Sequence, residues 1–131
     1  MSSSRELVER LAERINAGDL DGWVELYSED LVFGASAEWP ETTSVTGRDG
    51  LRQFWADFSG VWEDVKIRID NVHEADGAVI AECAWLTRGR ASGVEGTMEF
   101  VLGLWIRDGL IVRGQFYDDL SEGLDAVGLG D

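Results

Sequence analysis

The sequence predicts an α+β fold in which N-terminal helices pack against a strongly curved antiparallel sheet that encloses an apolar pocket. Two patterns support this prediction. Apolar residues recur at helical spacing through the first half of the chain, and they then alternate with polar residues at strand spacing between turn signals. Helices that precede such a meander must cover one face of its sheet. The length of 131 residues suits a single domain over residues 1–131.

Two helices are predicted at the N-terminus. Ser3 begins a capping box, and the apolar spacing predicts a helix over residues 4–17. Asp19 is placed to cap a second, shorter helix, which carries Tyr27 on its apolar face and ends near Ser28. These helices supply one apolar layer of the predicted core.

The next segment joins the helices to the sheet. A short strand is predicted at residues 31–33, followed by a loop over residues 34–45 in which Trp39 precedes the only proline. Thr46 is placed to cap a third helix, whose apolar face includes Trp55. Because Trp39 lies in a loop among acidic residues, it is a candidate lid over an apolar ligand.

The rest of the sequence predicts a four-stranded antiparallel meander. Apolar and polar residues alternate after the third helix, and turns that contain glycine separate the later strands. A last short helix, capped by Asp119, follows the meander. The predicted strands cover residues 65–70, 78–90, 94–107 and 110–117.

Charge and hydropathy exclude several classes of protein. The chain has 11 Lys plus Arg against 26 Asp plus Glu, a formal charge of -15, which opposes binding to nucleic-acid phosphates and to anionic lipid headgroups. Its longest apolar stretch is far shorter than the roughly 20 residues that a transmembrane helix needs. We therefore expect neither nucleic acid nor a membrane as a partner.

The single cysteine and the single histidine limit the chemistry further. Cys83 cannot form an internal disulfide, and the N-terminus shows no secretion signal, so we expect a cytoplasmic protein. Cys83 lies in an apolar run, where a small buried side chain is the usual role. The cysteine and histidine clusters that bind zinc cannot form, and no phosphate-binding loop occurs, so no cofactor is expected.

Five segments of the sequence are similar to one known family. They are INAGDLDG at residues 15–22, VTGRDGLRQF at 45–54, RGRASGVE at 88–95, LWIRDG at 104–109 and GLDAVGL at 123–129. These segments resemble the SnoaL-like family of the nuclear transport factor 2 (NTF2)-like or ketosteroid isomerase-like superfamily. The resemblance implies an NTF2-like cone with a mainly apolar cavity, often a homodimer through the outer sheet face. Its members include isomerases, polyketide cyclase-like proteins, dehydratases and epoxide hydrolases, so the resemblance alone selects no activity.

The catalytic residues of the better-known members have no counterparts at the matching positions. Alignment with ketosteroid isomerases places Leu11, Ala35 and about Leu102 where those enzymes carry a tyrosine, a base carboxylate and a protonated aspartic acid. Scytalone dehydratase-like enzymes need two histidines, whereas this chain has only His73. Alignment with limonene epoxide hydrolases places Phe116 near the aspartate of their last strand. The resemblance therefore transfers none of these catalytic sets.

Glu82 is the first candidate catalytic residue, because it is the only charge in the apolar run of residues 78–86. If the face that carries Ile80 and Ala84 points into the pocket, as the resemblance implies, Glu82 points there too. A carboxyl group in an apolar cavity holds its proton more tightly than in water and can transfer it near neutral pH. The alternative places Glu82 on the outer face of the sheet, at a dimer seam or a solvated rim.

Asp118 is the second candidate. It follows the last strand in phase with Phe116, which the resemblance turns inward, so Asp118 would share the cavity with Glu82 as an acid–base pair. The alternative is that the Asp118–Asp119 pair caps the final helix.

Two functions therefore stay open. In the first, the protein is a cofactor-independent isomerase, cyclase or hydrolase in which Glu82 and Asp118 act on a small hydrophobic molecule, such as a polyketide-like or terpenoid compound. In the second, a homodimer only binds such a molecule, or its cavity serves no ligand. In a cavity that binds a ligand, the expected contacts are Tyr27, Trp39, Trp55, Phe100, Leu102 and Phe116.

Overall fold

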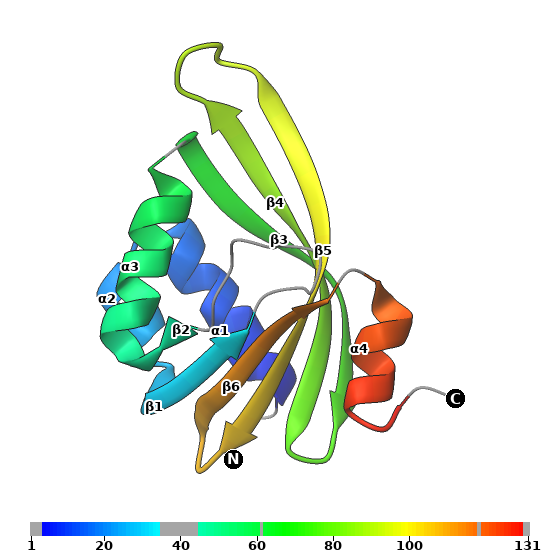
Figure 1. Cartoon of the computed structure of the whole chain (residues 1–131). Coiled ribbons are helices and arrows are strands. Elements are labelled where there is room, and N and C mark those ends of the chain that lie inside the picture. The colour runs from blue at the N-terminus through cyan, green and yellow to red at the C-terminus, as the bar shows by residue number, and fades with distance from the viewer. Residues whose placement is uncertain (1–3, 35–44, 61, 118, 130–131) are drawn as a thin grey trace.

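The computed structural model describes residues 4–34, 45–60, 62–117 and 119–129. It confirms the predicted α+β class, with helices at both ends of the described chain and a long meander between them (Figure 1). No helix in these ranges is both long enough and apolar enough to cross a bilayer. In chain order the elements are α1 (Ser4–Asn16), α2 (Leu20–Val24), β1 (Tyr27–Gly34), β2 (Val45–Thr46), α3 (Gly47–Ser59), β3 (Trp62–Ala75), β4 (Ala78–Gly89), β5 (Glu95–Arg107), β6 (Leu110–Tyr117) and α4 (Leu120–Ala126).

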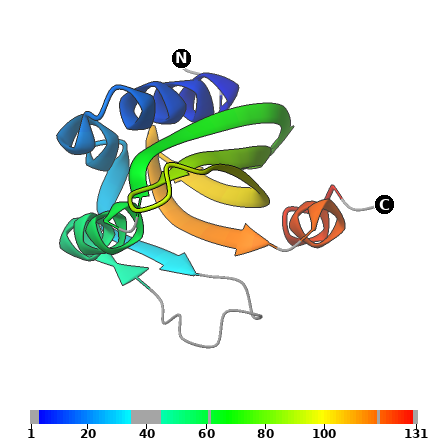
Figure 2. The same ribbon diagram turned by 90° about the horizontal axis from the view of Figure 1, so that it is seen from above.

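The strands form one curved, open sheet in the order β2-β1-β6-β5-β4-β3. The predicted meander is confirmed, because β3, β4, β5 and β6 pair antiparallel in sequence order. The parallel pairing of β1 with β6 has no signal in the local sequence pattern. Figure 2 shows how the sheet bends around one side, on which the N-terminal helices lie.

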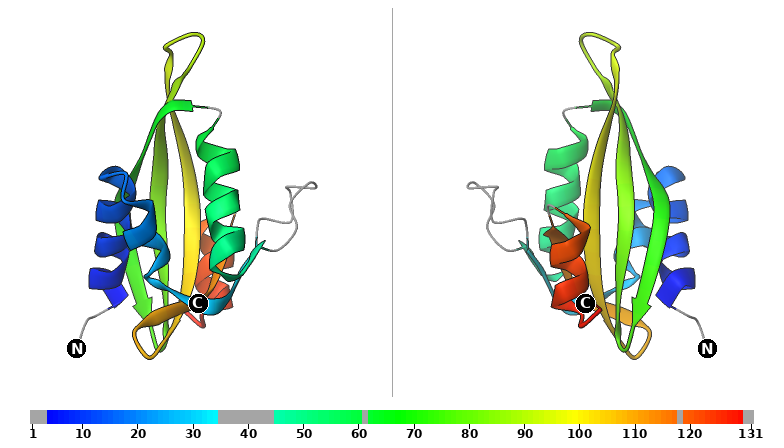
Figure 3. Two further views of the ribbon diagram at one scale, coloured as in Figure 1. Left: turned by 90° about the vertical axis from the view of Figure 1, so that its left-hand side faces the viewer. Right: turned by 90° about the vertical axis from the view of Figure 1, so that its right-hand side faces the viewer.

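The helices divide between the two faces of the sheet. The two views of Figure 3 show α1 and α3 over the concave face and α4 over the opposite, outer face. The backbone of α4 packs closely on the outer face at Gly123. A Cβ atom added to Gly123 would lie 3.0 Å from the Val101 side chain and 3.3 Å from the Ile80 side chain. The outer face of the sheet is therefore apolar where α4 covers it.

Local signals explain where most elements begin and end. The Asp19 side chain caps α2 by accepting a hydrogen bond from the backbone N–H of Gly22 at 3.0 Å, as predicted. Thr46 is the N-cap residue of α3, but its side chain makes no capping hydrogen bond. Asp108 and Gly109 form the predicted β5–β6 turn with positive φ angles of 54° and 81°.

Tyr27 is the clearest departure from the predicted elements. The apolar spacing predicts a helix up to Ser28, whereas α2 ends at Val24 and Tyr27 begins β1. The backbone N–H of Ile111 in β6 donates to the carbonyl of Leu26 at 2.9 Å. Pairing with a strand more than eighty residues away in sequence thus overrides the local helical pattern.

The first helix is fixed to the sheet at its edge strand. Its residues Leu7, Val8, Leu11 and Ile15 are buried, as their spacing predicts. The Asn16 side chain then pairs with the open edge of β3, donating to the Ile67 carbonyl at 3.0 Å and accepting from the Ile67 N–H at 2.8 Å. These two bonds satisfy backbone groups that no further strand pairs with.

Candidate functional site: an aromatic cavity under the helices

A small apolar cavity lies between the helical layer and the concave face of the sheet. Thirteen of the described residues line it, and they come from α1, α2, α3 and from all the described strands except the short β2. Their side chains are aliphatic or aromatic, with one hydroxyl group and three indole N–H groups among them. They are Leu11, Ile15, Trp23, Tyr27, Phe33, Leu51, Phe54, Trp55, Ile67, Trp85, Phe100, Leu102 and Phe116.

The lining side chains nearly fill the cavity. The gaps between them total about 350 Å³ when the open mouth is included, but only about 20 Å³ accepts the centre of a water-sized sphere. One water molecule needs roughly 10–15 Å³ by that measure. Phe54, Trp55 and Phe100 line the cavity and remain partly exposed, so they flank its mouth. A larger ligand must displace some of these side chains when it enters.

Aromatic rings form a continuous cluster along the cavity. Trp85 stacks on Phe100 with ring centroids 5.1 Å apart, and Phe100 meets Phe116 edge-on at 5.5 Å. Phe116 lies 4.9 Å from Phe33. On the helical side, the rings of Trp55 and Trp85 are 5.9 Å apart. Rings at these separations can pack on a flat apolar molecule as they pack on one another.

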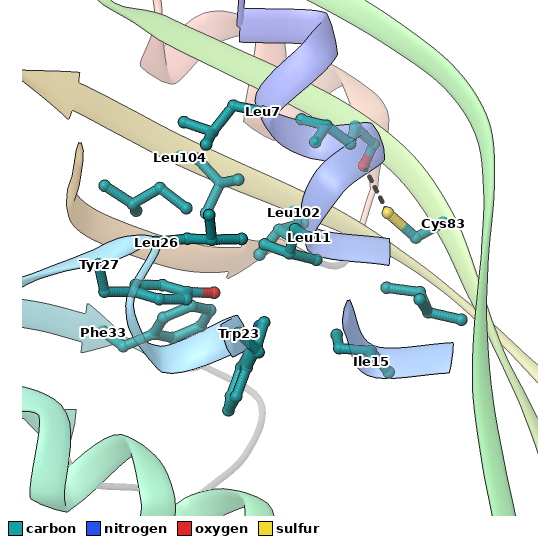
Figure 4. Close-up of a cluster of buried hydrophobic side chains, with 14 of the residues drawn as sticks. Leu7, Leu11, Ile15, Trp23, Leu26, Tyr27, Phe33, Cys83, Leu102 and Leu104 are labelled. Atoms are coloured by element: carbon teal, nitrogen blue, oxygen red, sulfur yellow. Dashed lines mark hydrogen bonds between the residues drawn. The ribbon is translucent and has the colours of Figure 1, made fainter. Parts of the chain in front are cut away.

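Two of these polar side chains, Tyr27 and Trp23, lie beside each other in the lining. Figure 4 shows the Tyr27 hydroxyl directed inward, toward the space between Leu11 and Trp23. Burial raises the pKa of Tyr27 far above its ordinary value, and the nearby Trp23 indole N–H offsets only part of this rise. The two rings meet edge-on with centroids 5.5 Å apart, but the Trp23 N–H does not reach hydrogen-bonding geometry. Tyr27 therefore stays protonated and can act as a donor.

Five of the six residues expected to contact a ligand line this cavity. The sixth, Trp39, and the candidate acid Asp118 lie outside the described residues. The role of all six in binding stays a prediction. The five in the cavity are Tyr27, Trp55, Phe100, Leu102 and Phe116.

The expected position of Glu82 inside the pocket is wrong. Along β4, Cys83 and Trp85 point into the core, and Cys83 pairs with the cavity residue Phe100 of β5. Because neighbouring residues of a strand face opposite ways, Glu82 lies on the outer face, where it pairs with Val101. The run around Glu82 is apolar on both faces because α4 covers part of the outer one. Hydrophobicity alone therefore could not show which face of β4 points into the pocket.

On the outer face the Glu82 carboxylate lies within hydrogen-bonding distance of the His73 ring. Nε2 of His73 lies 2.9 Å from Oε2 of Glu82, and 34% and 31% of the two side chains are exposed. Asp70, Glu99 and Asp119 border the same shallow surface. Among the described residues, no three His, Cys, Asp or Glu side chains gather so as to hold a metal ion. The contact was not foreseen, because an irregularity between Ile69 and Asn71 shifts the register of β3 against β4.

Asp119 has the capping role that the sequence predicts. Its Oδ1 accepts a hydrogen bond from the backbone N–H of Glu122 at 2.9 Å, which closes the first turn of α4. Because α4 then packs on Ile80 and Val101, this cap also helps to cover the outer face.

Cys83 is buried in the core and is not a reactive thiol. The residue is 2% exposed, and its Sγ lies 3.6 Å from the carbonyl oxygen of Ala81 (Figure 4). Burial raises the pKa of the Cys83 thiol to about 12, and the negative charges of Asp70 and Glu82 add to the rise. A thiol with this pKa stays protonated at neutral pH and is a poor nucleophile.

Trp23 and Trp85 also line the cavity, although they were not among the predicted ligand contacts. Trp85 was not predicted at the cavity because the opposite face of β4, the one that carries Ile80 and Ala84, was expected to point inward. Trp85 lies on the same face as Cys83, which is the face that points into the core. Trp23 has the spacing of an ordinary core residue on α2, and nothing in that spacing separates a cavity wall from a packed core.

A curved antiparallel sheet with helices over an apolar interior defines the NTF2-like cone, and solved structures show the same fold. IdmH from Streptomyces antibioticus, a proposed polyketide cyclase, is 22% identical with a TM-score of 0.78, covering 97% of this chain and 99% of its own. A protein with a ketosteroid isomerase-like fold from Catenulispora acidiphila is 20% identical with a TM-score of 0.76, covering 98% and 95%. A proposed SnoaL-like polyketide cyclase from Jannaschia sp. CCS1 is 17% identical with a TM-score of 0.74, covering 94% and 90%.

The sequence itself gives the family. Residues 8–114 match the model of the SnoaL-like domain, and this range covers most of the chain. The chain therefore belongs to the SnoaL-like family, as the resemblance of its five segments indicates. No protein of curated function matches the sequence.

Proposed function

We propose that the protein binds a small, flat, mostly apolar molecule of polyketide-like or terpenoid kind in the aromatic cavity. The observation that carries this proposal is the composition of the cavity wall, in which all thirteen described lining residues are aliphatic or aromatic. A wall of this kind gains free energy by removing apolar ligand surface from water, at roughly 25 cal/mol per Å². The names of two structural neighbours, both proposed polyketide cyclases, support the class of ligand.

The site favours a neutral ligand. None of the described lining residues is an Arg, Lys or His, so the cavity offers no cation to compensate an anionic group. The formal charge of -15 also repels anions at longer range. A charged ligand would lose its hydration on entering the cavity without gaining a partner of opposite charge, so a neutral ligand is favoured.

Acid–base catalysis of the cyclase or isomerase type is the second candidate, and membership of the SnoaL-like family favours it. Such catalysis needs a titratable group at the cavity, and Tyr27 is the only one among the described lining residues. Its raised pKa makes it a hydrogen-bond donor and a poor base near neutral pH. Binding is therefore the function that the described part of the site supports best.

Equilibrium dialysis with fluorene, a flat tricyclic hydrocarbon, tests this proposal. We expect saturable binding of one molecule per cavity. Trp55→Ala removes a ring from the mouth and should weaken binding about tenfold, because one aromatic contact is lost. Trp105→Ala is the matched control, since Trp105 is also partly exposed but packs against Arg113, with the guanidinium 4.5 Å from the ring centroid. Absence of saturable binding, or equal weakening by both variants, would contradict the proposal.

A further inference from the structure

The first part of β5, residues 95–100, is a free edge of the sheet. Strand β6 pairs with β5 only from Val101 to Arg107, so among the described residues this free edge has a strand partner on one side alone, which is β4. Figure 1 shows this part of β5 continuing past the end of β6 into the hairpin with β4. Residues 95–99 are all exposed. A free edge of this kind offers unpaired backbone groups to another strand.

The alternation of the β4–β5 ladder shows which backbone groups the free edge offers. The Gly89 N–H donates to the Val94 carbonyl at 3.0 Å, and the two strands pair from there without a shift of register. In an antiparallel pair every second residue bonds to the partner strand, so the even-numbered residues of β5 bond to β4. The N–H and carbonyl groups of Glu95, Thr97 and Glu99 therefore point away from β4, and none of them bonds to a described residue.

The edge strand β3 is protected, in contrast. The Asn16 side chain bonds to both backbone groups of Ile67, and Nη2 of Arg5 donates to the Val72 carbonyl at 3.4 Å. Natural sheets protect their edges by such covering contacts, or by proline, lysine or a bulge in the edge strand. The free edge of β5 has the sequence EGTMEF, without proline or lysine, and pairs with β4 without a bulge. It is therefore regular enough to accept a further strand.

The two sides of the free edge differ in chemistry. On the concave side, Met98 is 38% exposed, and Phe100 is half-buried with its ring stacked on Trp85. Because neighbouring residues of a strand face opposite ways, the side chains of Glu95 and Glu99 lie on the outer side. A strand added here would also place its alternate residues on the two sides. Those on the concave side would have to be apolar.

The outer side of the free edge is acidic. Glu99 borders the shallow surface that also includes Asp70, Glu82 and Asp119. Arg68 compensates one of these charges, since its Nε lies 2.7 Å from Oδ1 of Asp70. The formal charge of -15 adds to the attraction for basic groups. A second copy of the chain is a poor partner, because it would bring two acidic edges together.

We propose that the free edge of β5 binds an extended segment of another protein in which basic and apolar residues alternate. The segment adds a strand to the sheet through the outward backbone groups of Glu95, Thr97 and Glu99. Its apolar side chains pack on Met98 and Phe100, and its basic side chains face Glu99 and the acidic surface. This interaction goes beyond the proposed function and does not depend on a ligand in the cavity.

Two capped peptides of the same composition test this proposal. The sequence KVKVKVK alternates basic and apolar residues, whereas KKVVVKK does not. Calorimetric titration of the full chain should show saturable binding of the alternating peptide, about tenfold tighter than that of the other. In ¹⁵N-labelled protein, the alternating peptide should slow hydrogen exchange of the Glu95, Thr97 and Glu99 amides, because they become hydrogen-bonded.

Substitutions at Thr97 separate the backbone contact from the side chain. Thr97→Pro removes an outward N–H but no bond to β4, so the fold should persist while binding of the alternating peptide is lost. Thr97→Val keeps the N–H and is the matched control, with unchanged affinity. Glu99→Lys should weaken binding about threefold, because it reverses a charge at the exposed edge. The exchange measurement on the native chain holds even if Thr97→Pro fails to fold.

Three results would overturn the proposal. Equal affinity for the two peptides would show attraction between charges alone, and absence of saturable binding up to about 1 mM peptide would show that the edge accepts no strand. A dimer that forms with rising protein concentration and is lost in Thr97→Pro would make a second copy the partner instead. Thr97 does not line the cavity, so fluorene binding tests the proposed function separately.

Discussion

The helices α1 and α3 cover the same face of the sheet but are attached to it differently. Four residues of α1 are buried, and its last residue, Asn16, is hydrogen-bonded to the edge strand. In α3 only Leu51 is buried, and its aromatic residues Phe54 and Trp55 are half-exposed at the cavity mouth. The comparison separates a helix that is buried against the sheet from one whose aromatic side chains remain partly exposed at the cavity mouth. Substitutions in the two helices should therefore have different consequences.

The largest effect on stability is expected from Leu11→Ala in α1. Leu11 is 1% exposed, and removal of a buried leucine side chain costs about 2–5 kcal/mol of unfolding free energy. Urea unfolding followed by circular dichroism measures this loss. Leu86→Ala, at a leucine that is 36% exposed, is the control and should cost far less. Equal losses at the two positions would show that α1 does not hold the core.

The edge contact of α1 should give the next largest effect. Asn16→Ala leaves the N–H and the carbonyl of Ile67 without their partner, which we expect to cost about 1–3 kcal/mol of unfolding free energy. Asn71→Ala, at an exposed asparagine of the same strand, serves as the control. If both variants unfold at the same urea concentration, the edge contact contributes nothing.

The pH dependence of the unfolding free energy tests whether water is excluded from the core around Cys83. Its thiol pKa is about 12 in the folded protein against 9.0 in the unfolded chain, so the folded state keeps a proton that the unfolded state loses. Stability is therefore fully present below pH 9.0 and falls as the pH rises from there toward 12, by up to about 1.4 kcal/mol per pH unit. Cys83→Ala should flatten the decline between pH 9 and 10 in urea titrations. An unchanged slope would mean that the thiol is hydrated.

A smaller effect is expected in α3. Phe54→Ala removes a half-exposed ring, so the unfolding free energy should fall by only about 1–2 kcal/mol, less than for Leu11→Ala. The affinity for fluorene should fall as well, because Phe54 lines the cavity. A stability loss as large as that of Leu11→Ala, with unchanged fluorene binding, would contradict the conclusion that α3 contributes less to the core than α1 does.

The sequence predicts the parts of this fold that local chemistry determines. The bounds of α1, the Asp19 and Asp119 caps and the Asp108–Gly109 turn all follow from short-range patterns. The start of β1 at Tyr27 does not, because a hydrogen bond from Ile111 of β6 decides it.

The candidate site shows the same limit. Residues on the regular faces of helices and strands were placed at the cavity correctly, among them Phe100 and Phe116. The sequence left two faces open for Glu82 as a candidate catalytic residue, because the strand is apolar on both sides and only the packing of α4 distinguishes them; the structure places it on the outer face. The pairing of Glu82 with His73 depends on an irregularity in β3 and has no sequence signal.

The central claim, that the aromatic cavity binds a flat apolar molecule, is tested most directly by mapping fluorene on ¹⁵N-labelled protein. We predict saturable shifts of the indole N–H signals of Trp23, Trp55 and Trp85, which line the cavity, and no shift for Trp105. Shifts that concentrate on Trp105, or no saturable shift at the three cavity tryptophans, would contradict it.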